Sequence, residues 1–375
     1  MSVRSVGVEE ELLLVDTETG QPRAVAGMVL DQADEQDSAG TGADQDIADA
    51  LDFELQLQQL ETNTRPCRGL DELGREVRRC RAWAGQAAGQ AGVQVAALAT
   101  SPVPAEPEVV DKSRYQKMTR RFGLIAQEQL VCGCHVHVEI TSAEEGVAAL
   151  DRIGPWLPVL LALSANSPFW QGHDSSYASF RYQAWGRWPS SGPTAPFGTA
   201  ATYHATVRQM TATGTVLDAG MVYFDARLSQ HYPTLEIRIA DVCLWADDAV
   251  LIAALARALV ETETRRWREG KPAQPWRAEL LRLAAWRASR SGMDDVLLNP
   301  HTGLPQPSAV VAAMLLEHVQ DALAQAGDSD TAAELLTAVL GRGTGATFQR
   351  NAYRRSGDLA SIVASAVTAS AAQHR

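Results

Sequence analysis

The sequence predicts an α+β protein in which helices pack on an antiparallel sheet. Segments with strand-like alternation dominate the first two thirds of the chain, whereas the last third is mainly helical in pattern. Strands and helices that are segregated along a chain favour this class over a parallel sheet. We find no internal repeat and no clear linker, so we expect one domain spanning residues 1–375.

The expected strands show either alternating apolar and polar residues or a short apolar run bounded by turn residues. They cover Ser5–Asp16, Phe53–Thr62, Val93–Thr100, Leu130–Thr141, Met221–Leu228 and Thr234–Ala240. The first contains the apolar run Leu12–Val15, so it should be largely buried.

The expected helices cover Leu70–Ala88, Lys112–Gln129, Ala143–Ser164 and Ala246–Trp267, with further helices towards Arg375 interrupted at Gly341–Gly345. Pro155 and Pro158 should kink or break the third helix, because proline lacks an amide donor. We expect the polar stretch Asp31–Asp46 to be a solvated loop. The irregular segment Asn166–Gly198 is too aromatic for disorder, so we expect a lid or a site wall.

Composition narrows the class of protein. The net charge of −12 argues against a nucleic-acid partner, although local arginines and metals can still bind ATP. The N-terminus lacks the layout of a signal peptide, and we expect no apolar run long enough to span a bilayer. The five cysteines form no CxxC pair. We therefore expect a cytoplasmic protein with small-molecule substrates and no membrane partner.

The segment Cys132–Glu139 combines cysteines and histidines, which invites a zinc interpretation. Successive side chains of a strand point to opposite faces, so Cys132 and Cys134 lie with the valines. The opposite face carries His135, His137 and Glu139. The pattern therefore favours buried thiols and a polar histidine site over a Cys2His2 zinc site.

Two other strands repeat this division. Glu9 and Glu11 share one face of the first strand, with Glu10 on the other. Glu236 and Arg238 share a face opposite to the apolar residues of the last strand. Acids at the end of an exposed strand and a surface ion pair are the alternative interpretations.

Apolar and polar residues alternate less regularly in the segment Glu54–Glu61, because Leu60 departs from the alternation of Leu55 and Leu57. One extra residue near Gln58–Gln59, a bulge, would bring Glu54 and Glu61 onto the polar face, with Gln56 and Gln58 between them. Without the bulge, Glu61 lies with the leucines.

Together these faces form a set of oxygen donors with an occasional imidazole, which suits Mg²⁺ or Mn²⁺. Divalent ions bridging a polyphosphate would relieve the repulsion between the acids, and Arg238 could bind the phosphate with two hydrogen bonds. The chain has no GxxxxGK[ST] motif, and Gly341–Gly345 is too short for a dinucleotide fingerprint.

The same residues belong to longer motifs that resemble the YbdK-type carboxylate–amine ligases of the glutamate–cysteine ligase type 2 family. These motifs are GVEEELLLVD at Gly7–Asp16, QLET at Gln59–Thr62, CGCHVHVEI at Cys132–Ile140, SPFWQGHDSSYASFRYQAWGRWPSSG at Ser167–Gly192, TLEIRIAD at Thr234–Asp241 and GRGTGATFQR at Gly341–Arg350. The resemblance runs in order over nearly the whole chain.

The resemblance implies a glutamine synthetase-like fold, with ATP and divalent metals on the concave face of a curved antiparallel sheet. It implies metal-binding roles for Glu9, Glu11, Glu54, Glu61, His135 and Glu236. It implies a phosphate contact for Arg238, a role in ligand recognition for Arg181 and Arg187, and a homodimer. The implied reaction joins glutamate to an amine, cysteine in the best-known activity, through an acyl phosphate. A metal-dependent hydrolase and a non-catalytic nucleotide-binding relative remain alternatives.

Overall fold

The computed structural model describes residues 3–39 and 50–371. Within these residues, seven strands form a sheet in the order β2-β3-β1-β5-β9-β8, with β4 paired to β1 outside this path, and every pairing is antiparallel. The strands are β1 Val6–Val15, β2 Leu51–Phe53, β3 Gln59–Asn63, β4 Gln94–Ala96, β5 Gly133–Glu139, β8 Ala226–Leu228 and β9 Thr234–Asp241. Two small hairpins, β6 Phe169–Trp170 with β7 His173–Asp174 and β10 Val296–Leu298 with β11 Pro305–Pro307, lie outside this sheet.

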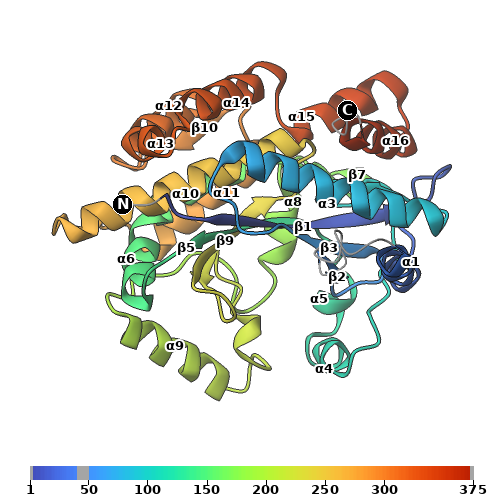
Figure 1. The fold of residues 1–375 in the computed structure, drawn as a ribbon, viewed down its shortest axis with the longest axis horizontal. Coiled ribbons are helices and arrows are strands. Elements are labelled where there is room, and N and C mark those ends of the chain that lie inside the picture. Colours follow the sequence, from blue (N-terminus) through green and yellow to red (C-terminus); the bar gives the residue numbers. More distant parts are fainter. Residues whose placement is uncertain (1–2, 40–49, 372–375) are drawn as a thin grey trace.

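The helices lie on both sides of the sheet (Figure 1). Those that precede β8 in the chain are α1 Ala26–Ala39, α3 Leu70–Gln90, α4 Ser113–Phe122, α5 Leu124–Gln127, α6 Ala143–Ile153, η1 Gly154–Trp156, α7 Leu157–Ser164, α8 Phe180–Trp185, α9 Ala200–Ala212 and η2 Ala219–Met221. Those that follow are α10 Ala246–Arg268, α11 Ala278–Ser291, α12 Ser308–His318, α13 Gln320–Ala326, α14 Ser329–Arg342, α15 Gly345–Ser356 and α16 Leu359–Ala371.

The main core lies between the sheet and the long helix α10, on what we call the helix-covered face. Alternate side chains of the central strands, such as Val8, Val136 and Ile237, are at most 2% exposed and belong to the same apolar cluster as Leu255 of α10. Alternation along a strand then places the intervening polar side chains on the opposite face. We call this opposite face the cavity face.

The helix-covered face also carries one buried charge pair. Glu10 accepts hydrogen bonds from Nε and Nη2 of Arg81 on α3, at 2.8 and 2.6 Å. Removing one partner of a pair at this depth would leave an uncompensated buried charge. Glu10 therefore has a structural role, which agrees with its predicted separation from Glu9 and Glu11.

Several predicted elements need correction. Phe53–Thr62 is not one bulged strand, because β2 and β3 are separate strands that pair with each other. Residues 31–39 are part of helix α1, whose Val29 and Ala33 are buried one turn apart, and residues 40–46 of the expected loop lie outside the described residues. The expected helix from Lys112 is divided into α4 and α5 at Gly123, where φ is +56°.

The expected strands Val93–Thr100 and Met221–Leu228 are mostly irregular, and only β4 and β8 remain of them. The predicted proline kink is confirmed, since the 3-10 turn η1 separates α6 from α7. Ala143–Ser164 as a whole is nevertheless long and apolar enough to cross a membrane, contrary to expectation. Because 83% of its most apolar window is buried inside the protein, this is weak evidence for a membrane span.

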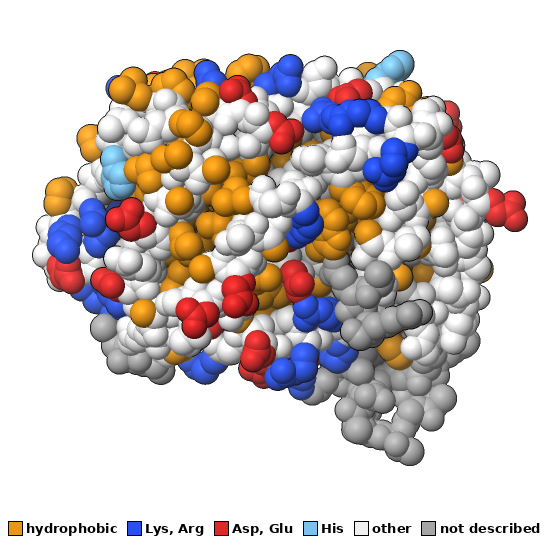
Figure 2. Space-filling model, turned by 90° about the horizontal axis from the view of Figure 1, so that it is seen from above, with side chains coloured by type: hydrophobic (Ala, Val, Ile, Leu, Met, Phe, Trp, Pro, Cys, Tyr) orange, Lys and Arg blue, Asp and Glu red, His pale blue; other side chains and the backbone are white. Residues whose placement is uncertain are grey.

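Seen from above, the molecule shows a band of hydrophobic side chains flanked by charged ones (Figure 2). The C-terminal helices α12 and α14 leave Val310 and Leu340 47% and 40% exposed. These helices lie on the helix-covered side of the sheet, away from α4 and α9 (Figure 1).

Candidate active site

A polar cavity of about 350 Å³ lies on the cavity face. Carboxylates from β1, β3 and the β2–β3 connection line it together with His135 of β5, and Arg227 and Arg238 of the last two strands. Its lining residues are Glu9, Glu11, Asp52, Phe53, Glu54, Leu55, Glu61, Arg114, Tyr115, Met118, His135, Trp185, Trp188, Gly220, Tyr223, Arg227, His231 and Arg238. The cavity therefore brings together Glu9, Glu11, His135 and Arg238, which alternation along the strands had placed on one face, while Glu236 does not line it and contacts Arg238.

The first group of possible metal ligands consists of Glu9, His135 and Glu236 from three neighbouring strands, with donor atoms within 4.8 Å of one another. Glu9 is paired with His135 in the β1–β5 register, and its Oε2 lies 3.3 Å from Nδ1 of His135. Burial alone would raise the pKa of Glu9, but contacts with His135 and His137 hold it well below its usual value.

The second group consists of Glu11, Glu54 and Glu61, again with donor atoms within 4.8 Å of one another. Glu61 needs no bulge to reach the cavity, because the β1–β3 register places it directly opposite Glu11. Burial, followed by the charge of Glu11, raises the pKa of Glu54 to about 8. Burial and the charge of Glu9 raise the pKa of Glu61 well above its usual value.

The two groups fit divalent cations. Carboxylates crowded together in a buried site resist ionisation unless a cation balances their charge. His135 adds a specific signal, since its buried Nε2 has no hydrogen-bond partner among the described residues and lies 3.7 Å from Oε1 of Glu11. Oxygen donors with one imidazole suit Mg²⁺ or Mn²⁺.

Glu236 lies between two arginines. Arg227 donates to Oε2 and Oε1 of Glu236 at 2.7 and 3.1 Å, and Nη1 of Arg238 also contacts Oε1. Burial would raise the pKa of Glu236, but the charges of Arg238 and Arg227 outweigh it and lower the pKa to about 2. The carboxylate therefore stays ionised, and two cations remain close to the metal ligands.

Sequence reasoning missed Arg227, although a signal for it was present. Arg227 alternates with the buried residues Ala226 and Leu228, and it pairs with Glu236 in the β8–β9 register. Alternation of side chains along β8, applied as on the other strands, would have placed the guanidinium of Arg227 on the cavity face.

Aromatic side chains form one wall of the cavity. Trp185 and Trp188 of the irregular segment have ring centroids 4.7 and 5.6 Å from that of Tyr223. The guanidinium of Arg238 lies 5.9 Å from the ring of Trp185. The segment 166–198 thus supplies a site wall, as expected.

Arg181 comes from the same segment and crosses β5 beneath the cavity. A Cβ at Gly133 would lie only 2.2 Å from its Nη2, so this close approach requires glycine. Arg181 is 2% exposed and has no ion pair among the described residues; its guanidinium lies 3.4 Å from the carbonyl oxygens of Arg238 and Ile239. Arg181 does not line the cavity, and its charge acts on the buried carboxylates of Asp241 and Asp225, whose pKa it lowers against the effect of burial.

A buried hydrogen-bond network holds this segment in place. Asp241, at the end of β9, accepts hydrogen bonds from Asn166 N, Ser167 Oγ and Ser179 Oγ at 2.7–2.9 Å. Ser167 Oγ in turn accepts from the amide of Arg181 at 3.0 Å. The motif Gly341–Arg350 supports the same network, because Gln349 donates to both oxygens of Asn166 at 2.8 Å.

Some predicted polar residues lie elsewhere. Arg187 does not line the cavity and forms an ion pair with Glu128 at 2.6 Å. Gln56 and Gln58 are buried and donate to backbone carbonyls, so they are not part of a shared polar face with Glu54. Glu139 lies at the far end of β5, where it accepts from Ser5. The cysteines are all buried, and neither described group of possible metal ligands contains one, in agreement with the prediction.

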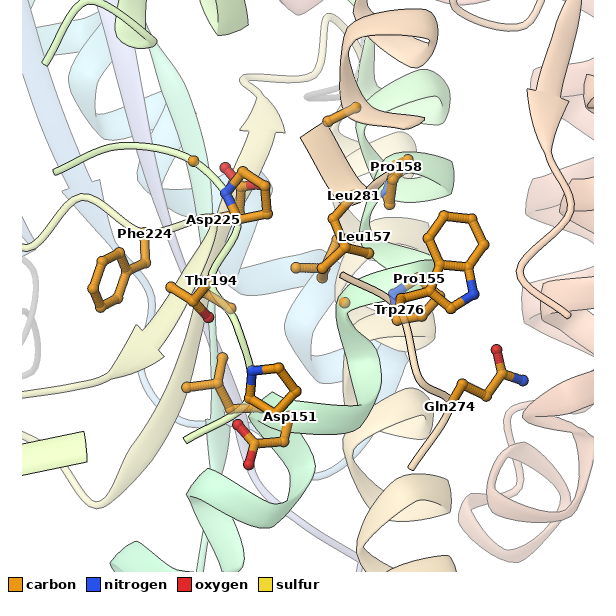
Figure 3. Close-up of a pocket in the computed structure, with 17 residues that line it drawn as sticks. Asp151, Pro155, Leu157, Pro158, Thr194, Phe224, Asp225, Gln274, Trp276 and Leu281 are labelled. Carbon is orange, nitrogen blue, oxygen red and sulfur yellow. The ribbon is translucent and has the colours of Figure 1, made fainter. Parts of the chain in front are cut away.

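A second cavity is smaller and has different chemistry (Figure 3). Its volume of about 30 Å³ leaves room for only a few water molecules, and Leu157, Leu281 and several prolines line it. Asp225 also lines it and accepts a hydrogen bond from Tyr182 at 3.2 Å. Burial raises the pKa of Asp225 to about 7. Neither group of possible metal ligands in the described chain includes residues of this cavity, so the larger cavity is the candidate active site.

Comparison with known proteins identifies the family. Residues 5–365 match glutamate-cysteine ligase family 2. The chain belongs to this family. It is 54% identical over 365 residues to a protein of Streptomyces avermitilis provisionally named glutamate–cysteine ligase 2-1, covering 97% of this chain and 99% of that protein. A relative in Streptomyces coelicolor, provisionally named glutamate–cysteine ligase 2, is 53% identical over 97% of this chain and 98% of its own.

Solved structures support the predicted fold class. The crystal structure of a glutamate–cysteine ligase from Francisella tularensis in complex with AMP has a TM-score of 0.68 at 13% identity, covering 100% of this chain and 89% of that one. A bifunctional glutathione synthetase from Pasteurella multocida has a TM-score of 0.69 at 15% identity, covering 99% of this chain and 53% of that one. The expected glutamine synthetase-like α+β fold and the expected ligase family are thus confirmed.

Proposed function

We propose that this member of glutamate-cysteine ligase family 2 is an ATP-dependent carboxylate–amine ligase that acts weakly on glutamate and cysteine. The observation that supports this most is the position of Arg238 and Arg227, which line the same cavity as five of the six possible metal ligands and contact the sixth, Glu236. Phosphoryl transfer needs mainly positioning and electrostatic stabilisation, which such an arrangement supplies.

The proposed reaction has two steps. The side-chain carboxylate of glutamate attacks the γ-phosphorus of ATP, giving an acyl phosphate and ADP. The amine of the second substrate then attacks the acyl carbon, phosphate leaves, and the nitrogen loses a proton to give the amide. No protein nucleophile is needed in either step.

Each group of side chains has a proposed role. Glu9, His135 and Glu236 would hold one divalent cation, and Glu11, Glu54 and Glu61 another. When bound, Mg²⁺ or Mn²⁺ would neutralise charge on the phosphate oxygens. Arg238 would donate to oxygens of the transferred phosphoryl group.

Arg181 and the aromatic wall would act on the substrates. The buried guanidinium of Arg181, which has no ion pair among the described residues, would suit a carboxylate or phosphate of a ligand that reached it from the cavity. The indoles of Trp185 and Trp188 would keep water away from the acyl phosphate, which water otherwise hydrolyses. Arg187 would first have to leave Glu128 before it could contact a ligand.

The amine acceptor is the least constrained part of this proposal. The residues proposed to bind metal and phosphate follow from their positions on the strands. By contrast, no single residue of the aromatic wall specifies cysteine as the acceptor. We therefore expect weak activity with cysteine. A kcat/KM for cysteine of about 10⁴ M⁻¹s⁻¹ or above would instead identify cysteine as an efficient substrate.

The deciding experiment is a phosphate-release screen of glutamate and other carboxylates against a panel of amines, with ATP and Mg²⁺. ATP consumption that requires both a carboxylate and an amine supports the ligase. Hydrolysis without an amine favours a metal-dependent hydrolase that uses the same acids. Nucleotide binding with no turnover for any pair favours a non-catalytic relative.

We propose that residues 1–375 form a single ligase domain in the cytoplasm. Its partners would be small molecules, neither nucleic acid nor membrane. A homodimer stays a prediction that sedimentation or light scattering can test.

A further inference from the structure

One short helix beside the cavity has a charge opposite to that of the protein. Five of the ten residues from Lys112 to Arg121 are basic and none is acidic, in a chain whose net charge is −12. Two of the three lysines of the whole chain, Lys112 and Lys117, occur here. The basic residues are Lys112, Arg114, Lys117, Arg120 and Arg121, and all but Lys112 belong to α4.

Helix α4 forms part of the mouth of the candidate active site. Its Arg114, Tyr115 and Met118 line the cavity. Lys117 and Arg120, three residues apart, are exposed instead. Such spacing puts two side chains on one face of a helix. Figure 1 shows α4 on the side of the sheet opposite to α3, and thus on the cavity side.

The basic residues of this helix differ in their partners. Arg114 donates to Asp218 at 2.8 and 3.0 Å, and Lys112 lies 3.8 Å from Asp52. Arg121 donates to a backbone carbonyl. Lys117 and Arg120 have no hydrogen bond or ion pair with any residue that the structure describes. Two charges of the exposed face are thus uncompensated.

The cavity has an electrostatic problem that this face would relieve. Glu9, Glu11, Glu54 and Glu61 line the site, so an approaching polyanion meets carboxylates there. A cationic surface beside the entrance raises the local concentration of an anion and increases its association rate. The effect acts over a Debye length of about 8 Å at physiological salt, so no fixed contact is required.

We propose that Lys117 and Arg120 form a capture surface that steers a nucleoside triphosphate into the cavity. This inference rests on the proposed use of ATP. Among the proposed substrates, the triphosphate carries the most negative charge and therefore responds most strongly to the positive field of the two side chains. The surface accelerates association and leaves the bound complex unchanged. An acidic protein segment is the competing occupant of the same face.

The test measures association and dissociation rates of a fluorescently labelled ATP with Mg²⁺ by stopped-flow anisotropy. The variant is K117E/R120E. The control is R354E/R355E, which makes the same charge change at exposed residues of α15 on the opposite side of the sheet. Melting curves of both variants establish that they fold, and K117Q/R120Q serves as a milder second variant.

At low salt, K117E/R120E should lower the association rate constant about tenfold relative to the control, with the dissociation rate unchanged. The glutamine variant should give a smaller decrease. The difference should vanish near 1 M salt, where the Debye length falls to about 3 Å. Equal association rates for variant and control would overturn the inference, and so would a change confined to dissociation, which indicates direct contact.

The same data separate this inference from the proposed function. If the unaltered protein binds no labelled ATP at any salt concentration, the ATP-dependent function itself fails. If it binds with association rates that do not respond to salt, the ligase proposal survives and the capture surface does not. If the association rates of all variants depend on salt to the same extent, charges other than those of Lys117 and Arg120 cause the salt dependence, and the capture surface is rejected.

Discussion

Glu11 of β1 and Glu61 of β3 lie directly opposite each other in an antiparallel pair, with Glu54 completing a group of three carboxylates. Like charges placed directly opposite each other destabilise a sheet. On the other face of β1, Glu10 has Arg81 as a partner, whereas this group has no comparable cation within the described residues. The arrangement indicates a ligand that supplies positive charge.

Glu61→Gln should therefore stabilise the metal-free protein and weaken its response to metal. We expect the free energy of unfolding without metal to rise, because burial and the charge of Glu9 oppose ionisation of Glu61, and glutamine carries no charge to be buried. Added Mn²⁺ should raise the melting temperature of this variant less than that of the unaltered protein, because a lower affinity gives less stabilisation by mass action. Thermal melts with chelator and with Mn²⁺ measure both effects.

Glu10→Gln is the matched control for that experiment. It removes the same charge one residue from Glu11, but on the helix-covered face and from a buried ion pair with Arg81. It should destabilise the protein by about 3–5 kcal/mol and leave the shift caused by Mn²⁺ intact. The same response to Mn²⁺ in both variants would contradict the assignment of faces.

The stability of the metal-free protein should fall as pH rises from about 4.5 to about 8. The pKa of Glu54 rises from 4.5 to about 8 on folding, so the folded state binds more protons than the unfolded state in this range. Stability therefore decreases through the window and levels off above it. Urea midpoints with chelator at a series of pH values test this, and Glu54→Gln should flatten the slope. A rise in stability over this range would reject the buried, uncompensated state of Glu54.

The sequence predicts the site where the alternation of side chains within one strand decides which face a residue occupies. The faces of Glu9, Glu11, His135 and Glu236 follow from the sequence because each lies inside a single strand, where alternation decides the face, although the register between β5 and β9 shifts between Cys134 and Val136. Glu61 was ambiguous because the register comes from pairing across strands, which a single segment does not encode. The division of 53–62 into two strands with a turn removed the need for a bulge.

Long-range packing set the other limits. Arg181 was assigned to a recognition loop from resemblance, but its passage over Gly133 depends on a network between Asp241 and segments far apart in the sequence. The richness of Asp31–Asp46 in Asp, Gln, Gly and Ala predicts a loop, but residues 31–39 form the second part of helix α1, which Val29 and Ala33, buried one turn apart, attach to the core. Composition predicts such marginally amphipathic segments poorly.

His135→Ala should reduce metal affinity and activity much more than Cys134→Ala. His135 lines the cavity, whereas Cys134 is fully buried in the main apolar cluster on the other face of β5. The cysteine change should cost roughly 1 kcal/mol of stability, as small core truncations do, with metal binding retained. Calorimetric titration with Mn²⁺ and a urea curve for each variant distinguish these outcomes. Equal loss of metal affinity in two well-folded variants would reverse the face assignment.

Arg238→Lys should lower turnover strongly although it keeps the charge. Arg238 is 9% exposed, and it shares the carboxylate of Glu236 with Arg227. Its guanidinium offers a planar fork to two phosphate oxygens, where lysine offers one compact charge. Loss of one well-placed donor to the transition state typically costs on the order of 10²–10³ in rate.

The rival account is that Arg238 serves only as a partner for Glu236. Arg227 would then keep Glu236 paired in the lysine variant, so turnover would stay unchanged and stability would fall little. Metal affinity should survive in either case, because every proposed ligand is retained. Steady-state kinetics, a melting curve and a Mn²⁺ titration of Arg238→Lys, compared with Arg227→Lys, separate the two accounts. A phosphate-binding Arg238 predicts a loss in kcat for Arg238→Lys that exceeds the loss for Arg227→Lys, while equal and small losses would remove Arg238 from the catalytic proposal.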